Sequence, residues 1–130
     1  MQEPVWVLDD TVLAIHNRQI AEHGGLAGVR DPGALKSALD RPKNKFAYAE
    51  PDIYELAAAY GYGIASNHPF SDGNKRTAYV VSLLFLALNG LKVEASHEEK
   101  YRTFLNLAAG KIGEEQLATW FKTHCKPLQG

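Results

Sequence analysis

The sequence predicts an all-α protein, a single compact domain of about six helices around a central apolar helix at about residues 74–90. A chain of 130 residues suits one domain with one core. Every residue between Ala78 and Leu88 except Ser82 is apolar, so a helix there would be hydrophobic on all sides and buried. This run is too short to cross a bilayer, which needs about 20 residues. Apolar residues at helical spacing elsewhere supply the remaining helices.

Capping and stop signals predict the first two helices. Acidic and threonine side chains at residues 9–11 can cap a helix that runs without glycine or proline to residue 23. A glycine-rich loop covers residues 24–33, and within it Asp31 is the predicted N-cap of the second helix. We expect that helix to end at Arg41, because the residue before Pro42 is disfavoured in helical geometry.

The segment after the second helix shows no helical period. Residues 43–51, KNKFAYAEP, are basic and aromatic, and we expect them to form an exposed flap. A third helix is predicted at residues 52–67, followed by the apolar helix. Beyond it we expect a brief extended link at residues 91–95 and two amphipathic helices, which contain residues 101–108 and 117–124.

The charge balance limits the classes of partner. Fourteen Lys and Arg residues against fifteen Asp and Glu give a net charge of −1. This leaves no basic face for nucleic acid or an anionic membrane, so we expect neither as a direct partner. The single cysteine, Cys125, excludes an intrachain disulfide and fits a reducing compartment. The first ten residues do not resemble a signal peptide, so we expect a cytoplasmic protein.

The loop before the apolar helix has the properties of an anion site. Lys75 and Arg76 fall in or near the first helical turn, where the helix dipole disfavours cations. A bound phosphate removes this conflict, because the backbone N–H groups, the dipole and both cations then favour the same ligand. Gly73 lets the backbone approach such a ligand closely. The sequence therefore predicts a phosphate-binding helix N-terminus.

The same loop holds candidates for catalysis. Asp72 is well placed to hold Mg²⁺ that bridges phosphate oxygens. His68 is near enough in sequence to share the pocket and to take a proton from an attacking hydroxyl. Phe70 is predicted to anchor the loop on the core. Together these are the parts of a phosphoryl or nucleotidyl transferase.

Each of these residues also has a simpler interpretation. Asp72 can be only a helix cap, Gly73 only a turn, and Arg76 only a solvated charge. A single histidine in a loop is more often a hydrogen-bonding residue than a base. Their combination at one helix terminus favours the functional interpretation.

The nine residues 68–76, HPFSDGNKR, resemble the signature loop of the Fic/Doc superfamily, H-x-F-x-(D/E/N)-(G/A)-N-(G/K)-R. The likeness is greater to the death-on-curing (Doc) toxin branch, because Lys75 stands where Fic proteins usually have glycine and Tyr79 where they have a further arginine. Residues 24–39 and 45–50 also resemble that branch. The resemblance therefore implies a Fic/Doc-like domain that spans the whole chain, residues 1–130.

The resemblance also implies roles for individual residues. His68 would be the general base and Asp72 the Mg²⁺ ligand. The phosphates of ATP would be held by Gly73, Asn74, Lys75 and Arg76. Doc-type proteins transfer a phosphoryl group from ATP to a protein hydroxyl, with translation elongation factor Tu as the substrate of the family. A protein of this kind is a translation-arresting toxin.

Two other functions remain open at this stage. A Fic-like protein would transfer AMP instead of phosphate, and a non-catalytic relative would only bind another protein. Within residues 43–51, Phe46 and Tyr48 are similar in position to the target-docking segment of the family, although this stretch can equally be a connecting loop. No Ser or Thr is followed by Glu at the fourth place, as in self-inhibited Fic proteins, so a cognate antitoxin is expected.

Several further residues are predicted to have no chemical role. The four histidines outside the loop show no metal-ligand spacing, and we interpret them as surface or packing residues. They are His16, His23, His97 and His124. Arg30 lies in the glycine-rich loop, where it could assist with the nucleotide or the target, but a capping or surface role is the main expectation.

Overall fold

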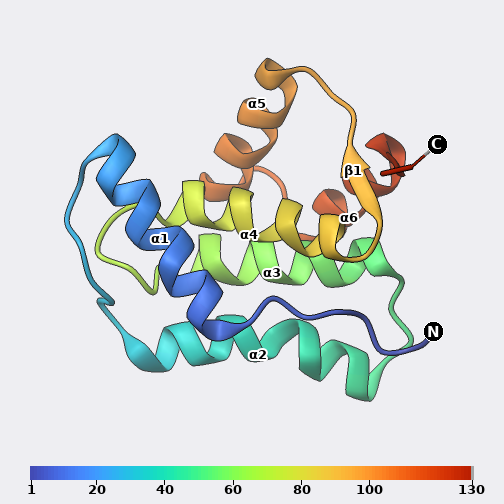
Figure 1. Ribbon diagram of the computed structural model, residues 1–130, viewed down its shortest axis with the longest axis horizontal. Helices are drawn as coiled ribbons and strands as arrows, with labels where there is room; N and C mark the ends of the chain where they lie inside the picture. The colour runs from blue at the N-terminus through green and yellow to red at the C-terminus, as the bar shows by residue number, and fades with distance from the viewer. Residues whose placement is uncertain (130) are drawn as a thin grey trace.

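The computed structural model describes residues 1–129 (Figure 1). Over this range the chain forms six helices and two short strands, so the all-α prediction is confirmed. The elements in chain order are α1 (Asp9–His23), α2 (Pro32–Tyr48), α3 (Ile53–Asn67), α4 (Asn74–Leu88), β1 (Leu91–Val93), α5 (His97–Ala108), α6 (Glu114–His124) and β2 (Cys125–Pro127).

Local side-chain caps explain where three of the helices begin. Asp31 accepts a hydrogen bond of 3.0 Å from the first turn of α2, as the sequence predicts. At the start of α3, Asp52 and Glu55 each accept from the other's backbone N–H, at 2.8 and 3.1 Å, which forms a capping box. Ser96 caps α5 through a 3.1 Å bond from Glu99.

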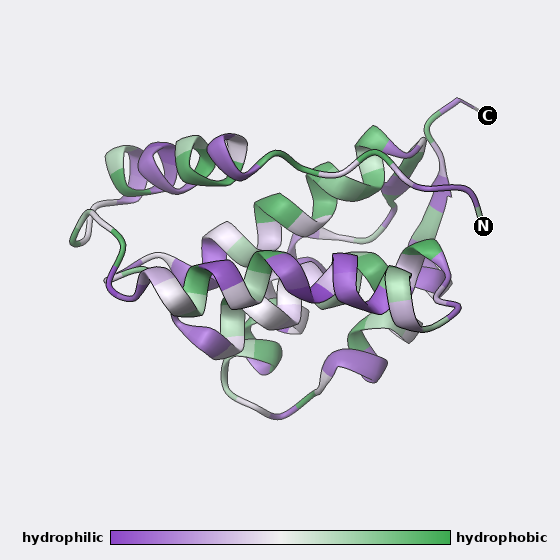
Figure 2. Ribbon diagram, turned by 90° about the horizontal axis from the view of Figure 1, so that it is seen from below, coloured by the Kyte–Doolittle hydropathy of each residue, from purple (hydrophilic) through white to green (hydrophobic). Residues whose placement is uncertain are grey.

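The core lies between α3 and α4, which run side by side through the middle of the molecule (Figure 1). α3 is the more completely buried of the two, because it also packs against α2 and α6. Tyr60 of α3 and Phe85 of α4 meet with ring centroids 5.1 Å apart. The Tyr60 hydroxyl accepts a 3.2 Å bond from the Val7 N–H, and burial raises the pKa of Tyr60 to about 12. Seen from below, hydrophilic and hydrophobic residues alternate along the outer helices, as amphipathic helices require (Figure 2).

The predicted end of the second helix before Pro42 is wrong, because α2 continues to Tyr48. Pro42 is itself buried, and the helix is packed on both sides of it. Ala38 is fully buried before the proline, and Phe46 after it contacts Trp6 edge to face, at a centroid distance of 5.8 Å. Packing of α2 against α3 and the N-terminal segment therefore outweighs the local preference against helix before proline.

A partly buried charge network joins α2 to α6. The Glu114 carboxylate contacts the guanidinium of Arg41 at 2.7 Å and the ammonium of Lys45 at 3.3 Å. Arg41 also lies over the ring of Tyr62 at 4.9 Å. Burial alone would raise the pKa of Glu114, but the hydrogen bonds and charges of Arg41 and Lys45 together lower it.

The extended link expected after the apolar helix is the strand β1, which pairs antiparallel with β2. Val93 lies opposite Cys125 in this ladder, so the end of α6 is held beside the end of α4. Cys125 is buried, and burial raises the pKa of its thiol to about 11. Among residues 1–129, no helix combines the length and apolar character needed to cross a membrane.

Candidate functional site

The loop from His68 to Gly73 joins the C-terminus of α3 to the N-terminus of α4. His68 is the C-cap of α3 and adopts the left-handed conformation, with φ 49° and ψ 55°. Over residues 1–129 it is the one non-glycine residue with positive φ. This conformation ends the helix abruptly and leaves the His68 side chain exposed to solvent.

Phe70 fixes the middle of the loop to the body of the protein. Its side chain is 0% exposed, and its ring stacks on the imidazole of His16 with centroids 3.8 Å apart and planes at 7°. His16 lies on α1 and is 1% exposed. Its Nε2 is 2.8 Å from the carbonyl oxygen of Asp72, so Nε2–H is the donor. One buried side chain of α1 thus holds both Phe70 and the backbone of Asp72.

Asn74 closes the loop on itself. Its side-chain oxygen accepts from the Phe70 N–H at 3.0 Å, and its side-chain nitrogen donates to the Phe70 carbonyl at 3.0 Å. Both polar atoms of this side chain are therefore used within the loop. What Asn74 offers to a ligand is its backbone N–H at the start of α4.

The glycine-rich loop before α2 pairs with the loop of residues 68–73. Val29 and Phe70 form an isolated antiparallel bridge, and the Ser71 N–H donates to the Gly28 carbonyl at 3.2 Å. The N–H groups of Arg30 and Asp31 both donate to the carbonyl of Pro69, at 2.8 and 3.1 Å. Residues 24–31 thus form a second layer of backbone against the loop, at the left end of the molecule in Figure 1.

Arg30 adds side-chain bonds to this contact. Its Nε donates to the His68 carbonyl at 2.9 Å, and Nη2 donates to the same oxygen and to the Asn67 carbonyl at 3.3 Å. The guanidinium therefore caps the carboxyl end of α3, the capping role expected from the sequence.

Asp72 lies exposed at the end of the loop. Its Oδ2 accepts from the Leu26 N–H at 2.7 Å, which orients the carboxylate. Residues 1–129 contain no group of three or more acidic, histidine or cysteine side chains that could hold a metal. A cation here would therefore rely on the Asp72 carboxylate together with oxygens of a ligand and water, which is the usual coordination of Mg²⁺ beside phosphates.

The N-terminus of α4 is open to an anion. Its N-cap Gly73 has φ 77°, no side chain caps the helix, and no acidic residue lies in its first turn. The positive φ favours glycine, and a Cβ at Gly73 would lie 3.3 Å from Ile20 Cδ1, a tight contact that would require the Ile20 side chain to shift. Lys75 and Arg76 follow at once. The first turn of α4 thus combines the partial positive charge of the helix N-terminus with two cationic residues.

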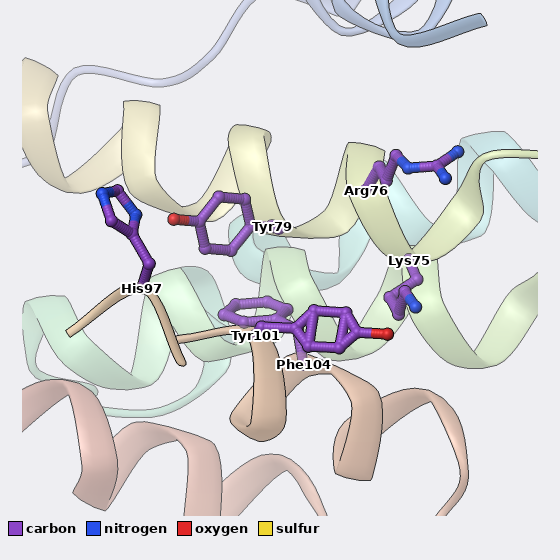
Figure 3. Close-up of a pocket in the computed structure, with 6 residues that line it drawn as sticks. All are labelled: Lys75, Arg76, Tyr79, His97, Tyr101 and Phe104. Carbon is purple, nitrogen blue, oxygen red and sulfur yellow. The ribbon is translucent and has the colours of Figure 1, made fainter. Parts of the chain in front are cut away.

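A cavity of about 270 Å³ opens beside this helix terminus, between α4 and α5 (Figure 3). Two rings form an edge-to-face pair in it, Tyr79 and Phe104, with centroids 5.1 Å apart. The Lys75 ammonium lies 4.9 Å from the ring centroid of Tyr101, a cation–π contact between the two helices. Partial burial raises the pKa of Tyr79. The residues that line the cavity are Lys75, Arg76, Tyr79, His97, Tyr101 and Phe104.

The structure brings most of the predicted site residues together, but not the expected target-docking pair. Residues 43–48 belong to α2, so the prediction of a non-helical flap is wrong. Phe46 is half-buried against Trp6, whereas Tyr48 is 89% exposed. The Asn67 side chain donates to the Ala34 carbonyl at 3.1 Å, which sets the start of α2 beside the end of α3. The other end of α2 therefore lies about 20 Å away along the helix axes.

Sequence reasoning missed two residues that shape the site. The sequence predicts a surface or packing role for His16; it is a packing residue, but the sequence does not show that it lies under the loop of residues 68–73. The signal was its spacing from Val12, since the two lie four residues apart on the buried face of α1. Tyr101 was interpreted only as part of an amphipathic helix, yet it is 57% exposed beside Lys75. No local pattern separates such a ring from a packing residue.

Comparisons with known proteins agree with this geometry. The profile of the Fic/DOC family matches residues 6–86. The protein named Protein kinase doc from Escherichia phage P1 is 37% identical over 110 residues, which cover 84% of this chain and 86% of that protein. The protein named Toxin Doc from Mycolicibacterium smegmatis (strain ATCC 700084 / mc(2)155) is 39% identical over 77 residues, 58% of this chain and 59% of that protein.

Proposed function

This chain belongs to the Fic/DOC family and is related to Doc toxins, and from that premise we propose that it is a Doc-like toxin that phosphorylates a protein. ATP would be the phosphoryl donor, a protein hydroxyl the acceptor, and elongation factor Tu the target. Modification of that factor would arrest translation. The names of the two relatives, a kinase and a toxin, support this combination.

The observation that carries the proposal is the uncapped N-terminus of α4 beside two cations. The other helices described begin with a side-chain cap or with acidic residues in the first turn. α4 has neither, and places Lys75 and Arg76 there. We assign the backbone from Gly73 to Arg76 and these two side chains to the phosphates of ATP. The Asn74 side chain instead keeps the loop in the shape that this requires.

His68 is the proposed general base. Its side chain is exposed, so the hydroxyl of a large protein can reach it. The imidazole takes the hydroxyl proton as the oxygen forms a bond to the γ-phosphorus. The bond from that phosphorus to the oxygen of the β-phosphate breaks, and ADP leaves. The protonated imidazole then returns its proton to solvent.

Asp72 is the proposed Mg²⁺ ligand. Its carboxylate is exposed and is oriented by the Leu26 N–H through one oxygen. When bound, Mg²⁺ would neutralise charge on the phosphate oxygens. The hydrogen bond from Leu26 and the contact of His16 with the Asp72 carbonyl keep this residue at the mouth of the anion site.

The cavity between α4 and α5 is the proposed place for the base of the nucleotide. It adjoins Lys75 and Arg76, and its walls are aromatic, which suits a planar heterocycle. Lys75 and Tyr101, now in contact, would separate or shift when a base enters between them. The phosphates would then extend toward Gly73 and Asp72.

We further propose that a cognate antitoxin restrains this protein. The support is the relation to Doc toxins together with the lack of the glutamate motif by which Fic proteins inhibit themselves. The antitoxin would be a separate chain encoded with the toxin.

The first experiment is a transfer assay with purified elongation factor Tu and Mg²⁺, run in parallel with ATP labelled at the γ- or the α-phosphate. We expect elongation factor Tu to be labelled by γ-labelled ATP only, and this labelling to be lost in His68→Ala. Label from the α-position would instead identify an AMP transferase. No label from either, with growth inhibition intact in His68→Ala, would favour a non-catalytic binding protein.

A further inference from the structure

The proposed base occupies a strained backbone position. A residue with a side chain is disfavoured at φ 49°, and such conformations persist only where the surroundings hold them. We propose that Arg30 is the residue that holds His68 in this conformation, and so acts as a positioning residue for the transfer reaction. The inference rests on the proposed function, in which His68 is the base.

The contact is made at the backbone of the base itself. Two guanidinium nitrogens of Arg30 converge on the His68 carbonyl, and one of them also reaches the Asn67 carbonyl. These carbonyls lie at the carboxyl end of α3, where the helix leaves acceptors without partners and carries a partial negative charge. Arg30 thus binds the peptide unit whose orientation is set by ψ of His68.

Arg30 is itself held by its backbone. Its N–H and that of Asp31 both donate to the Pro69 carbonyl, and Val29 is bridged to Phe70. The main chain of Arg30 is therefore fixed at Pro69, the residue after His68, while its side chain bonds the carbonyls of His68 and Asn67. A guanidinium held in this way can bracket a strained residue with little further loss of entropy.

The chemistry of the group explains why arginine suits this position. A guanidinium presents several donors in one rigid plane and can serve two neighbouring carbonyls at once. A lysine ammonium at residue 30 could serve one carbonyl but could not reproduce the planar fork. A neutral short side chain could do neither.

This role has a specific kinetic consequence. The phosphates are assigned to α4, on the far side of the loop, so loss of Arg30 should leave nucleotide binding nearly unchanged. The imidazole of His68 would spend less time where it can take the proton, so kcat should fall. We expect kcat to fall about tenfold in Arg30→Ala. This corresponds to a rise of about 1.4 kcal/mol in the activation free energy.

The experiment compares Arg30→Ala, Arg30→Lys and His68→Ala with the parent protein, and uses Arg18→Ala as the matched control. Arg18 is an exposed arginine whose side chain pairs with Glu22 on α1, so its loss makes the same change of charge. Steady-state assays with Mg²⁺, ATP and the target give kcat and the KM for ATP. Backbone NMR shifts and the HN–Hα coupling of His68, recorded without nucleotide, report its φ directly.

The expected result for Arg30→Ala is a tenfold lower kcat, a KM for ATP within about twofold of the parent, and a shift of the His68 backbone signals away from the left-handed region. The kcat of Arg30→Lys should lie between those of Arg30→Ala and the parent, and Arg18→Ala should match the parent. An unchanged kcat and unchanged His68 signals in Arg30→Ala, with His68→Ala inactive, would overturn this inference and leave the proposed function standing. Full activity of His68→Ala would overturn the proposed function, and the role of Arg30 with it.

Discussion

The imidazole of His16 lies parallel to the ring of Phe70, 3.8 Å between centroids, and its Nε2–H donates to the carbonyl of Asp72. One side chain of α1 therefore supports two points of the loop that carries the proposed base and metal ligand. The two rings are buried and the hydrogen bond is partly buried, so packing as well as the hydrogen bond fixes the position of His16.

Substitutions at His16 can separate these two contacts. His16→Phe keeps a ring against Phe70 but leaves the Asp72 carbonyl without its donor, which should cost about 1–2 kcal/mol. His16→Gln keeps a donor but loses the ring, and His16→Ala loses both, at a cost of about 3 kcal/mol. We expect all three to lower the free energy of unfolding, measured in urea. The KM for ATP should rise only where the donor is lost, and an equal KM in all variants would contradict this division of roles.

Gly73 is predicted to be essential for the anion site. Gly73→Ala places a methyl group in left-handed geometry and within 3.3 Å of Ile20. Gly90→Ala is a matched control, because Gly90 has φ 85° but open space around a Cβ. Both variants should lose about 1 kcal/mol of stability through strain. Only Gly73→Ala should also weaken ATP binding, by about tenfold, as measured by calorimetry; equal affinities in the two variants would argue against phosphate binding at α4.

Asn74→Asp tests whether the loop depends on the Asn74 amide. The carboxylate can still accept from the Phe70 N–H, but it faces the Phe70 carbonyl without a donor. We expect a loss of about 1–3 kcal/mol in the free energy of unfolding at pH 7. The loss should shrink at low pH, where the protonated acid can donate. A stability equal to that of the parent would show that the loop holds its shape without this bond.

The cavity between α4 and α5 predicts a role for Tyr101 in nucleotide affinity. Tyr101→Leu removes the aromatic face, and we expect the KM for ATP to rise about fivefold while stability changes little, because the ring is largely exposed. Tyr101→Phe keeps the face and should behave like the parent. Leu105→Ala, one turn further along α5 and also exposed, is the control. An unchanged KM in Tyr101→Leu would place the base elsewhere.

Glu114 should make stability depend on pH. Its pKa is lower in the folded protein than the ordinary value of 4.5, so its contribution is present above pH 4.5 and is lost as the pH falls through the folded value. Glu114→Gln should therefore cost about 1 kcal/mol at pH 7, because Arg41 and Lys45 lose their partner. The difference from the parent in thermal unfolding should shrink as the pH falls through the folded pKa of Glu114. A difference that persists below that pKa would assign the effect to packing instead of charge.

Local signals in the sequence were enough to place most helices and to select the loop of residues 68–76 as the candidate site. The cap at Asp31 acts within one turn of the chain, so it is readable without knowledge of the fold. The misplaced cations Lys75 and Arg76 were readable for the same reason. The predicted helix end before Pro42 was wrong. The local preference against helix before proline competes with the packing of α2, which no local pattern in the sequence reveals.

The sequence by itself thus indicated the all-α class, the approximate positions of the helices and the loop of residues 68–76 as the candidate site. Only the tertiary structure decided that His16 supports this loop from α1, that Arg30 binds the carbonyl of His68, and that a cavity lies beside Lys75. The physical reason is the range of the interactions. Caps and dipoles act over three or four residues, whereas the contacts of His16 and Arg30 join residues 56 and 38 positions apart, and packing of the whole chain brings them together.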